Sequence, residues 1–178
     1  MDRVALVSPT GDPVGTAPKS TVHGPRTPLH LAFSCHVSDD HGRVLVTRRA
    51  LGKATWPGVW TNAFCGHPTP GEQLGDALRR HARRELGVEL TDLDLVLPHF
   101  RYRAVDPSGV VEHEVCPVFR ARLVGELRPA PDEVLEHAWV EATDLAQAVR
   151  LAPWAFSPWL VLQLAELAAP ASAGAGPR

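Results

Sequence analysis

The amino-acid sequence predicts an α+β fold, in which helices pack against a mixed β-sheet around a central loop–helix–loop segment. Residues 29–37 alternate apolar and polar side chains, which is typical of a β-strand. Residues 72–87 repeat apolar side chains every three or four positions, which indicates a helix, and strand patterns resume after it. The chain of 178 residues has the length of one domain, and we expect that domain to span residues 1–168.

The N-terminal part is expected to form short strands separated by turns. Strand patterns cover residues 4–7, 29–37 and 43–49, turns cover 8–13 and 39–42, and a loop covers 51–58. The strict alternation within residues 29–37 indicates a half-buried strand. Before it, the segment that contains Lys19 and His23 is interrupted by Gly and Pro and has the composition of a flexible arm.

The helix over residues 72–87 is the most strongly marked element. Its apolar stripe is formed by Leu74, Ala77, Leu78, Ala82 and Leu86. Gly87 follows where a left-handed C-terminal cap belongs. His81 and Glu85 lie one turn apart beside the stripe, so Glu85 should point toward the body of the protein. A carboxylate there is costly unless it is paired or bound to a cation.

The C-terminal part predicts more extended chain and two helices. Extended segments are expected over residues 93–104, 110–123 and 138–141, a turn over 106–109, and helices over 143–149 and 158–168. In the strand at 110–123, Glu112, Glu114 and Cys116 share one face. Residues 169–178 are rich in Ala, Pro and Gly, and we expect them to form a disordered tail.

Composition and charge exclude several classes of protein. A net charge of −2 provides no global basic field, which argues against a nucleic-acid-binding protein. Cys35, Cys65 and Cys116 are odd in number and form no CxxC pair, which fits a reducing cytosol better than a disulfide-linked protein. The N-terminal residues have no signal-peptide pattern, and no segment is suited to spanning a bilayer. We therefore expect a cytoplasmic protein with no membrane or nucleic-acid partner.

The helix and the loop before it carry a recognisable motif. The spacing of the Nudix box, which binds diphosphates through divalent cations, is kept by Gly66, Glu72, Arg80, Glu85, Gly87 and Val88. At two further glutamate positions of the box this chain has His81 and Arg84. Together with Thr-Asn-Ala-Phe-Cys-Gly-His-Pro at residues 61–68, the box resembles that of the type I isopentenyl-diphosphate isomerases, a resemblance that covers about residues 3–165.

The resemblance implies a Nudix-like fold and a specific reaction. Isopentenyl diphosphate, a small-molecule substrate, would be isomerised to dimethylallyl diphosphate in isoprenoid precursor biosynthesis, without a flavin. Such a reaction protonates the terminal alkene carbon, passes through a tertiary carbocation and removes a proton from C2. It needs two proton carriers and a pocket that offers the cation no water.

The resemblance also implies a site for Mn²⁺ or Zn²⁺. The positions that match its five ligands are His23, His30, His67, Glu112 and Glu114. The strand pattern agrees, because Glu112 and Glu114 project from one face and two like charges so close together need a cation between them. Imidazole and carboxylate groups suit these metals. Without the resemblance, each histidine would be taken as a hydrogen-bonded residue and the two glutamates as a solvated strand edge.

A second cation, Mg²⁺, is expected at Glu85, where it would bridge to the diphosphate of the substrate. The alternative for Glu85 is a simple helical pair with His81. Lys19, Arg49 and Lys53 match the positions that hold the diphosphate in the family, and a substrate of such charge needs these contacts. Each would otherwise be a solvated surface charge.

Cys65 and Glu114 match the two proton carriers of the family. We assign the alkene side to Glu114, with Tyr102 as its hydrogen-bond neighbour, and the C2 side to Cys65, while the sequence leaves the choice of faces open. Trp159 matches the aromatic residue that faces the carbocation. The alternative for Cys65 is a small buried apolar residue.

Cys35 and Cys116 are predicted to be small buried apolar residues, and Trp154 is expected in the core.

Two other functions stay open. A Nudix hydrolase acting on a prenyl or nucleoside diphosphate needs several box glutamates to activate water, and His81 and Arg84 argue against it. A non-catalytic metal-stabilised binding module usually has a cysteine-rich tetrahedral site, which this chain does not show. We expect a monomer or a weak homodimer.

Overall fold

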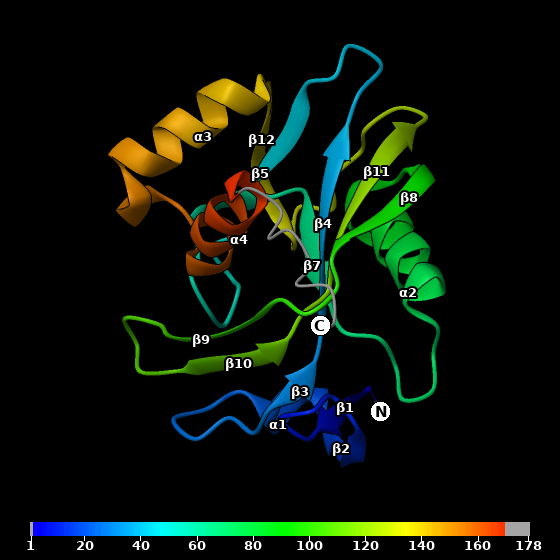
Figure 1. Ribbon diagram of the computed structural model, residues 1–178, viewed down its shortest axis with the longest axis vertical. Helices are drawn as coiled ribbons and strands as arrows, with labels where there is room; N and C mark the ends of the chain where they lie inside the picture. Colours follow the sequence, from blue (N-terminus) through cyan, green and yellow to red (C-terminus); the bar gives the residue numbers. More distant parts are fainter. Residues whose placement is uncertain (1, 170–178) are drawn as a thin grey trace, which may run out of the picture.

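The structure is a computed structural model that describes residues 2–169, and two sheets dominate it (Figure 1). The first sheet has the order β2–β1–β3–β10–β9 and contains β1 (Arg3–Val7), β2 (Pro13–Pro18), β3 (His30–Leu31), β9 (Arg101–Val105) and β10 (Val111–Val115). The second has the order β12–β5–β4–β11–β8 and contains β4 (Phe33–Ser38), β5 (Val44–Arg49), β8 (Glu89–Leu97), β11 (Val118–Val124) and β12 (Val134–Val140). Beside β5 and β4 lie β6 (Trp60–Asn62) and β7 (Phe64–Gly66). Apart from residue 169, the expected C-terminal tail lies outside the described residues.

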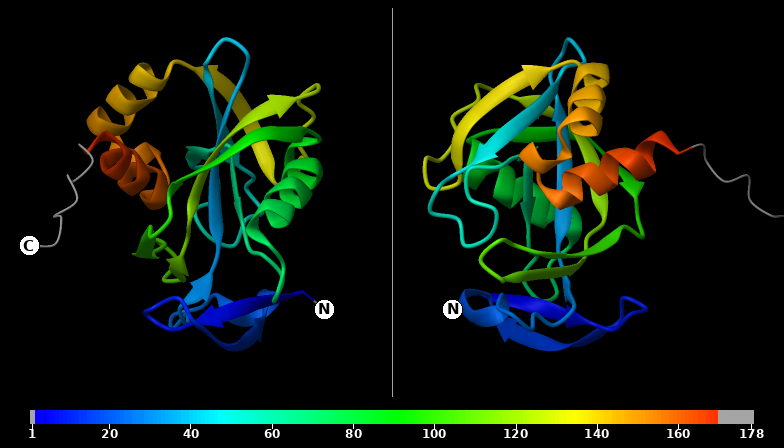
Figure 2. Two further views of the ribbon diagram at one scale, coloured as in Figure 1. Left: turned by 45° about the vertical axis from the view of Figure 1, so that its right-hand side comes forward. Right: turned by 90° about the vertical axis from the view of Figure 1, so that its left-hand side faces the viewer.

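Helices cover both faces of the second sheet. They are α2 (Leu74–His81), α3 (Ala142–Leu151) and α4 (Pro158–Ala168), with a π-helical turn over Ala82–Leu86 and a 3-10 turn over Pro153–Ala155. The short helix α1 (Lys19–Val22) lies instead beside β1 and β2 of the first sheet. Figure 2 shows α2 on one side of the sheet and α3 and α4 on the other. Phe33 and Leu78 share the core under α2, whereas Val46 packs with Leu145 and Leu160 under α3 and α4. The α+β fold with a mixed sheet is thus confirmed, and no described helix is long and apolar enough to cross a membrane.

Two chain segments run from one sheet into the other. Residues 29–37 and 110–123, each expected to form one strand, break at Ala32 and at Pro117. The second break is explained by Pro117 itself, because proline has no N–H to donate. Their halves lie side by side in both sheets, with β3 parallel to β10 and β4 parallel to β11. Across the break, the amide of Ala32 donates to the carbonyl of Val115 at 2.9 Å. The two segments therefore pass from one sheet into the other together.

The prediction that residues 29–37 form a half-buried strand was wrong. His30 and Ser34, on its polar face, are fully buried, and His36 is 8% exposed. Since α4 covers this face while α2 covers the other, the polar side chains must find partners inside the protein. His36 does so through Gln163 of α4, with 2.9 Å between His36 Nε2 and Gln163 Oε1.

The predicted helix at 72–87 is present, starting at Leu74 and ending in the π-helical turn. Gly87 caps it with a φ of 69°, the left-handed conformation that favours glycine. Gly66 is required for a different reason, since a Cβ atom there would lie 2.5 Å from the ring of His81. Gly66 therefore allows the close packing of α2 against β7, whereas Gly87 ends the helical segment.

Other predictions need correction. The segment before His30 is not a flexible arm, because β2 and α1 order it and the amide of Val111 donates to the carbonyl of Gly24 at 2.9 Å. Trp154 is not in the core, since the 3-10 turn leaves it 83% exposed. The extended chain expected over 93–104 is interrupted between β8 and β9, and the strand expected over 138–141 is the end of the longer β12.

Candidate active site

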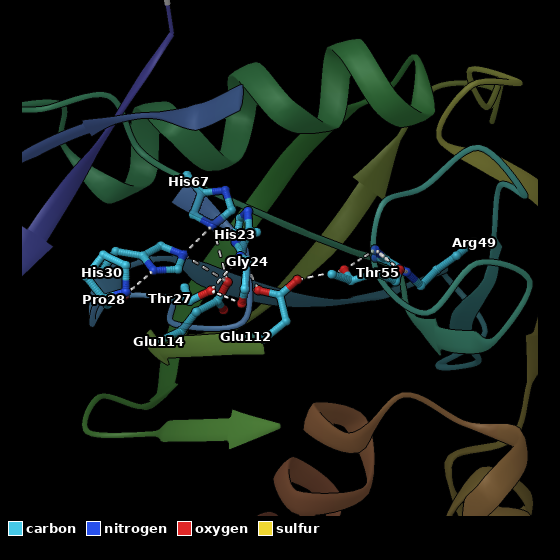
Figure 3. A network of polar contacts seen from close by, with 10 residues as sticks. All are labelled: His23, Gly24, Thr27, Pro28, His30, Arg49, Thr55, His67, Glu112 and Glu114. Atoms are coloured by element: carbon cyan, nitrogen blue, oxygen red, sulfur yellow. Dashed lines mark hydrogen bonds and ion pairs between the residues drawn. The ribbon is translucent and has the colours of Figure 1, made fainter. Parts of the chain in front are cut away.

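Three histidines and a glutamate converge where the two sheets diverge (Figure 3). His23 follows α1, His30 lies in β3, His67 follows β7, and Glu114 of β10 lies opposite His30 in the sheet register. One ligand atom from each lies within 4.8 Å of the others. The Nε2 atoms of His30 and His67 are 3.1 Å apart, and Oε1 of Glu114 is 3.2 Å from Nε2 of His67. Four of the five predicted ligands therefore form one cluster.

Glu112, the fifth predicted ligand, lies at the edge of this cluster. Its Oε2 atom is 3.1 Å from Nε2 of His23, yet neither atom makes a hydrogen bond within residues 2–169, although both are buried. A cation between these two atoms would satisfy both. Its other oxygen, Oε1, accepts a hydrogen bond from the hydroxyl of Thr55 at 2.7 Å.

The histidine tautomers also fit a cation. Nδ1 of His30 lies 3.0 Å from the carbonyl of Pro28, which requires the proton on Nδ1 and leaves the lone pair on Nε2. Burial by itself would raise the pKa of Glu114, but its contacts with His30 and His67 outweigh burial and hold that pKa well below the usual range. The cluster therefore directs Nε2 of neutral His30 and an ionised carboxylate toward its centre, which are donors that a divalent transition metal prefers.

The salt bridge between Arg80 and Glu72 holds the loop that carries His67. Arg80 donates from Nε and Nη2 to the two oxygens of Glu72, at 2.8 and 2.7 Å, and Nη2 also reaches the carbonyl of His67 at 3.3 Å. The Arg80 contact lowers the pKa of Glu72 to about 2. Glu72 and Arg80 of the box thus act on the loop backbone, and through it on the position of the His67 ring.

Most of the predicted site residues line one pocket of about 580 Å³. It is bordered by Lys19, His23, Arg49, Lys53, Cys65, His67, Glu85, Tyr102, Glu112, Glu114 and Trp159. Only His30 is missing from this wall, since it is fully buried behind the pocket within the histidine cluster. Cys65 and Glu114 therefore face a common cavity, the arrangement that a two-carrier proton transfer requires.

The thiol of Cys65 sits in a polar niche between the sheet and α4. Its Sγ atom lies 3.2 Å from the hydroxyl of Ser34 and 3.4 Å from Oδ1 of Asn62. Burial raises the pKa of this thiol to about 12, against the smaller opposing effect of these two hydrogen bonds. At neutral pH the thiol is therefore protonated, whereas Glu114 across the pocket is ionised.

Tyr102 and Trp159 form an aromatic wall of the pocket. Tyr102 lies directly opposite Glu114 in the pairing of β9 with β10, and burial raises the pKa of its hydroxyl well above the usual value. Within residues 2–169 this hydroxyl makes no hydrogen bond to Glu114, so the expected contact is not formed here. The rings of Tyr102 and Trp159 are 5.8 Å apart, and the guanidinium of Arg49 lies 5.2 Å from the centre of the Trp159 ring.

Glu85 enters the pocket from the π-helical turn, as its place beside the apolar stripe predicted. It is 8% exposed, and its Oε1 atom lies 2.5 Å from Nδ1 of His81. The helical pair that was the alternative for Glu85 is thus formed, while a second carboxylate oxygen is left for a cation.

Three cations, Lys19, Lys53 and Arg84, line the same pocket as Glu85, and the sequence predicted a role for the two lysines. Lys19 is partly buried, and burial, together with the charges of Arg84 and Lys53, lowers its pKa. Lys53 forms a salt bridge with Glu133. Arg84 and Asn62 lie in the motifs named from the sequence, but they were given no role in the site. Thr55 and Glu133 were not singled out at all, because the role of each depends on a distant partner.

A second pocket, of about 730 Å³, is apolar and opens on the outer side of Trp56. It lies between the loop at residues 56–59, the turn at 106–108 and the start of α4, and none of the predicted site residues lines it. Its wall offers no cluster of titratable groups, so the chemistry belongs to the first pocket.

Comparison with known proteins agrees with this geometry. Residues 28–160 match the family described as the NUDIX domain. The chain is 67% identical over 160 residues to the isopentenyl-diphosphate Delta-isomerase of Agromyces mediolanus, covering 90% of this chain and 78% of that protein. It is 56% identical over 178 residues to the isopentenyl-diphosphate Delta-isomerase of Paenarthrobacter aurescens, covering 98% and 97% of the two chains.

Solved structures share the fold. DR0079 from Deinococcus radiodurans superposes with a TM-score of 0.72 at 20% identity, covering 94% of this chain and all of that one. A MutT NUDIX hydrolase from Burkholderia pseudomallei superposes with a TM-score of 0.60 at 24% identity, covering 79% of this chain and 98% of that one. At such identities the likeness concerns the fold alone.

Proposed function

The chain belongs to the isopentenyl-diphosphate Delta-isomerases of the Nudix family, and on this premise we propose that it converts isopentenyl diphosphate into dimethylallyl diphosphate. The observation that carries the proposal is the shared cavity of Cys65 and Glu114. The reaction adds one proton at the terminal alkene carbon and removes another from C2, so two carriers must reach one substrate. A single pocket with a thiol and a carboxylate in its wall meets this requirement.

Cys65 and Glu114 are the two proton carriers in this proposal, and Tyr102 is the hydroxyl next to Glu114. The assignment from sequence gives the alkene side to Glu114 and the C2 side to Cys65. The protonated thiol and the ionised carboxylate of the free protein suit the reverse order, because neither group then needs a prior proton transfer. Deuterium exchange into recovered isopentenyl diphosphate distinguishes the two orders. A variant that lacks only the C2-side group can still exchange the protons of the terminal carbon, whereas a variant that lacks the alkene-side group cannot.

Trp159 is proposed to stabilise the tertiary carbocation. Its ring is 3% exposed and borders the pocket, so a cation formed there is largely desolvated. An indole face stabilises such a charge by about 0.5–2 kcal/mol. The aromatic wall also excludes water that would otherwise trap the cation as an alcohol.

Two cation sites are proposed from the residues present. The cluster of His23, His30, His67, Glu112 and Glu114 would hold Mn²⁺ or Zn²⁺, supported by the buried unpaired atoms of His23 and Glu112. Glu85 would hold Mg²⁺ with the diphosphate, and Lys19, Arg49 and Lys53 would contact the phosphate oxygens. Bound there, the cations supply positive charge that neutralises the diphosphate and fixes the carboxylates.

We also propose a cellular setting and an oligomeric state. Cys35, Cys65 and Cys116 are free thiols, which supports a reducing cytoplasm. The pocket is built by side chains of one chain, which supports a monomer or a weak homodimer.

Hydrolysis of a prenyl or nucleoside diphosphate is the competing activity. At the box positions that carry water-activating glutamates, this chain has His81, which is 2% exposed and engaged with Glu85, and Arg84. Both ring nitrogens of His81 face oxygen acceptors, Glu85 and the carbonyl of His67, and the guanidinium of Arg84 is a cation, so neither side chain supplies a free base for water.

The decisive experiment incubates the purified, metal-loaded protein with isopentenyl diphosphate and Mg²⁺ in D₂O. We expect dimethylallyl diphosphate and deuterium in both isomers by NMR, with no release of phosphate or diphosphate. Hydrolysis without any dimethylallyl product would overturn the proposal.

A further inference from the structure

One arginine on the pocket wall, Arg84, was not assigned to the site by the family resemblance. Arg84 lies in the π-helical turn, directly before Glu85, and borders the pocket. Its side chain is 52% exposed, and its Nη2 atom donates to Oε1 of Glu133 at 3.3 Å. Part of the guanidinium is therefore anchored, while the rest remains free to meet a ligand.

Glu133 joins Arg84 to Lys53. Its side chain is only 11% exposed, and its two oxygens divide between the two cations, Oε1 with Arg84 and Oε2 with Lys53. The charges of Arg84, Lys53, Glu85 and Glu133 all act on Lys19, so the five groups form one electrostatic cluster. This cluster has three cations and two carboxylates, which leaves positive charge for an anion even before a metal binds.

The neighbouring residue shows that this orientation is specific. Arg83 belongs to the same turn and has a similar exposure, 57% for its side chain. It does not border the pocket, and its Nε atom donates instead to Glu89 at 2.5 Å. The turn therefore directs one arginine outward and the next toward the cavity.

From this geometry we propose that Arg84 binds the diphosphate of the substrate next to Lys53, and that Glu133 holds both cations at the pocket before the substrate arrives. The inference rests on the proposed function for the identity of the diphosphate ester. A guanidinium can donate two parallel hydrogen bonds to phosphate oxygens, and only one of its nitrogens is used by Glu133. In this role the arginine contributes to substrate binding and not to proton transfer.

The test compares Arg84→Gln with the matched variant Arg83→Gln, and uses Arg84→Lys to restore the charge. The apparent KM for isopentenyl diphosphate and the affinity for inorganic diphosphate, measured by calorimetry with Mg²⁺, are both recorded. We expect Arg84→Gln to raise the apparent KM about tenfold and to lower the affinity for diphosphate about tenfold, while kcat stays within about threefold of the wild type. A tenfold effect is at the low end for a hydrogen bond to a charged group, because the side chain is half exposed. Arg83→Gln should match the wild type, and Arg84→Lys should bind more tightly than Arg84→Gln.

Equal diphosphate affinity of Arg84→Gln and Arg83→Gln would overturn the inference, and so would an Arg84→Lys variant weaker than Arg84→Gln. Thermal unfolding of each variant confirms that the fold is intact. Because calorimetry needs no turnover, the two proposals fail separately: absence of dimethylallyl product from the wild type contradicts the proposed function, whereas unchanged diphosphate affinity contradicts only the role of Arg84.

Discussion

Cys65 and Trp159 are held by the same atom, Oδ1 of Asn62. The thiol lies 3.4 Å from it, and the indole N–H donates to it at 3.1 Å. The amide nitrogen of Asn62 donates to the carbonyls of Cys35 and Phe64, both at 2.9 Å, so the side chain is fixed from the opposite end. The proposed proton carrier and the ring proposed to face the carbocation are therefore set relative to one another before substrate binds.

Replacing the thiol should stop catalysis without unfolding the protein. For Cys65→Ala we expect kcat to fall by about 10²- to 10⁴-fold, the usual contribution of a general acid or base. Cys35→Ala is the matched control, because Cys35 is fully buried on the face toward α2 and does not border the pocket. Product formation is followed by NMR; a Cys65→Ala enzyme with near-normal kcat would remove Cys65 from the mechanism.

The indole of Trp159 should matter through its π-system. We expect kcat to decrease in the order wild type, Trp159→Phe, Trp159→Leu, with a total loss of about 2- to 30-fold from the missing cation–π interaction. Trp154→Leu should leave kcat unchanged, since Trp154 is 83% exposed and lies in the wall of the other pocket. If Trp159→Leu and Trp159→Phe were equally active, the ring would serve packing alone.

Thr55 should control metal affinity although it is not a predicted ligand. Its hydroxyl donates to Glu112 at 2.7 Å, while Arg49 reaches the same hydroxyl at 3.3 Å, so Thr55 links the metal cluster to the diphosphate end of the pocket. We expect Thr55→Val to weaken binding of the cluster metal by about tenfold, as loss of a hydrogen bond to a ligand usually does. Metal content during dialysis against a chelator measures this, with exposed Thr91→Val as the control. Equal metal retention in both variants would exclude this role.

His36 should make the free energy of unfolding depend on pH, between the pKa of this ring in the folded protein and its pKa in the unfolded chain. Burial lowers the pKa of His36 to about 4, from an ordinary value of 6.5. Above 6.5 the ring is neutral in both the folded and the unfolded chain; as the pH falls toward 4, only the unfolded chain gains the proton. The free energy of unfolding should therefore drop by up to about 3 kcal/mol over this range.

The matched variant for that measurement is His36→Gln, which keeps a donor near Oε1 of Gln163 and cannot be protonated. The histidines proposed to bind metal are the same in both proteins, so the difference between the two unfolding curves isolates His36. Chemical denaturation at pH 7, 6, 5 and 4 should show the wild type losing stability faster than the variant. Parallel curves would mean that His36 is not a buried neutral ring.

The sequence alone predicted the orientation of those residues that belong to short-range patterns. The alternation that puts Glu112 and Glu114 on one face, and the helical spacing that turns Glu85 inward, depend only on local geometry. The fold class followed from the same periodicities. Each of these patterns is complete within a few residues, so no knowledge of distant contacts was needed.

What the sequence could not predict depends on contacts between distant residues. Thr55 and Glu112 are 57 positions apart, and Arg84 and Glu133 are 49 apart. Ser34 and His36 have the polar alternation of a solvated face, but α4 covers them, and only the tertiary structure reveals their burial. The break at Pro117 was readable in principle, because a proline inside a long strand argues against one continuous ladder.

The breaks at Ala32 and Pro117 have a consequence for how the enzyme assembles. The segment that carries His30 continues into β4, and β4 pairs with the strand that carries Cys65, with Ser34 opposite Cys65 in the register. Aligning β4 with β11 therefore also brings His30 beside Glu114, because the same two backbones pass through both sheets. The metal cluster and the Cys65 niche should consequently form in one cooperative folding step. A folding intermediate with the metal cluster complete but Cys65 out of place is therefore not expected.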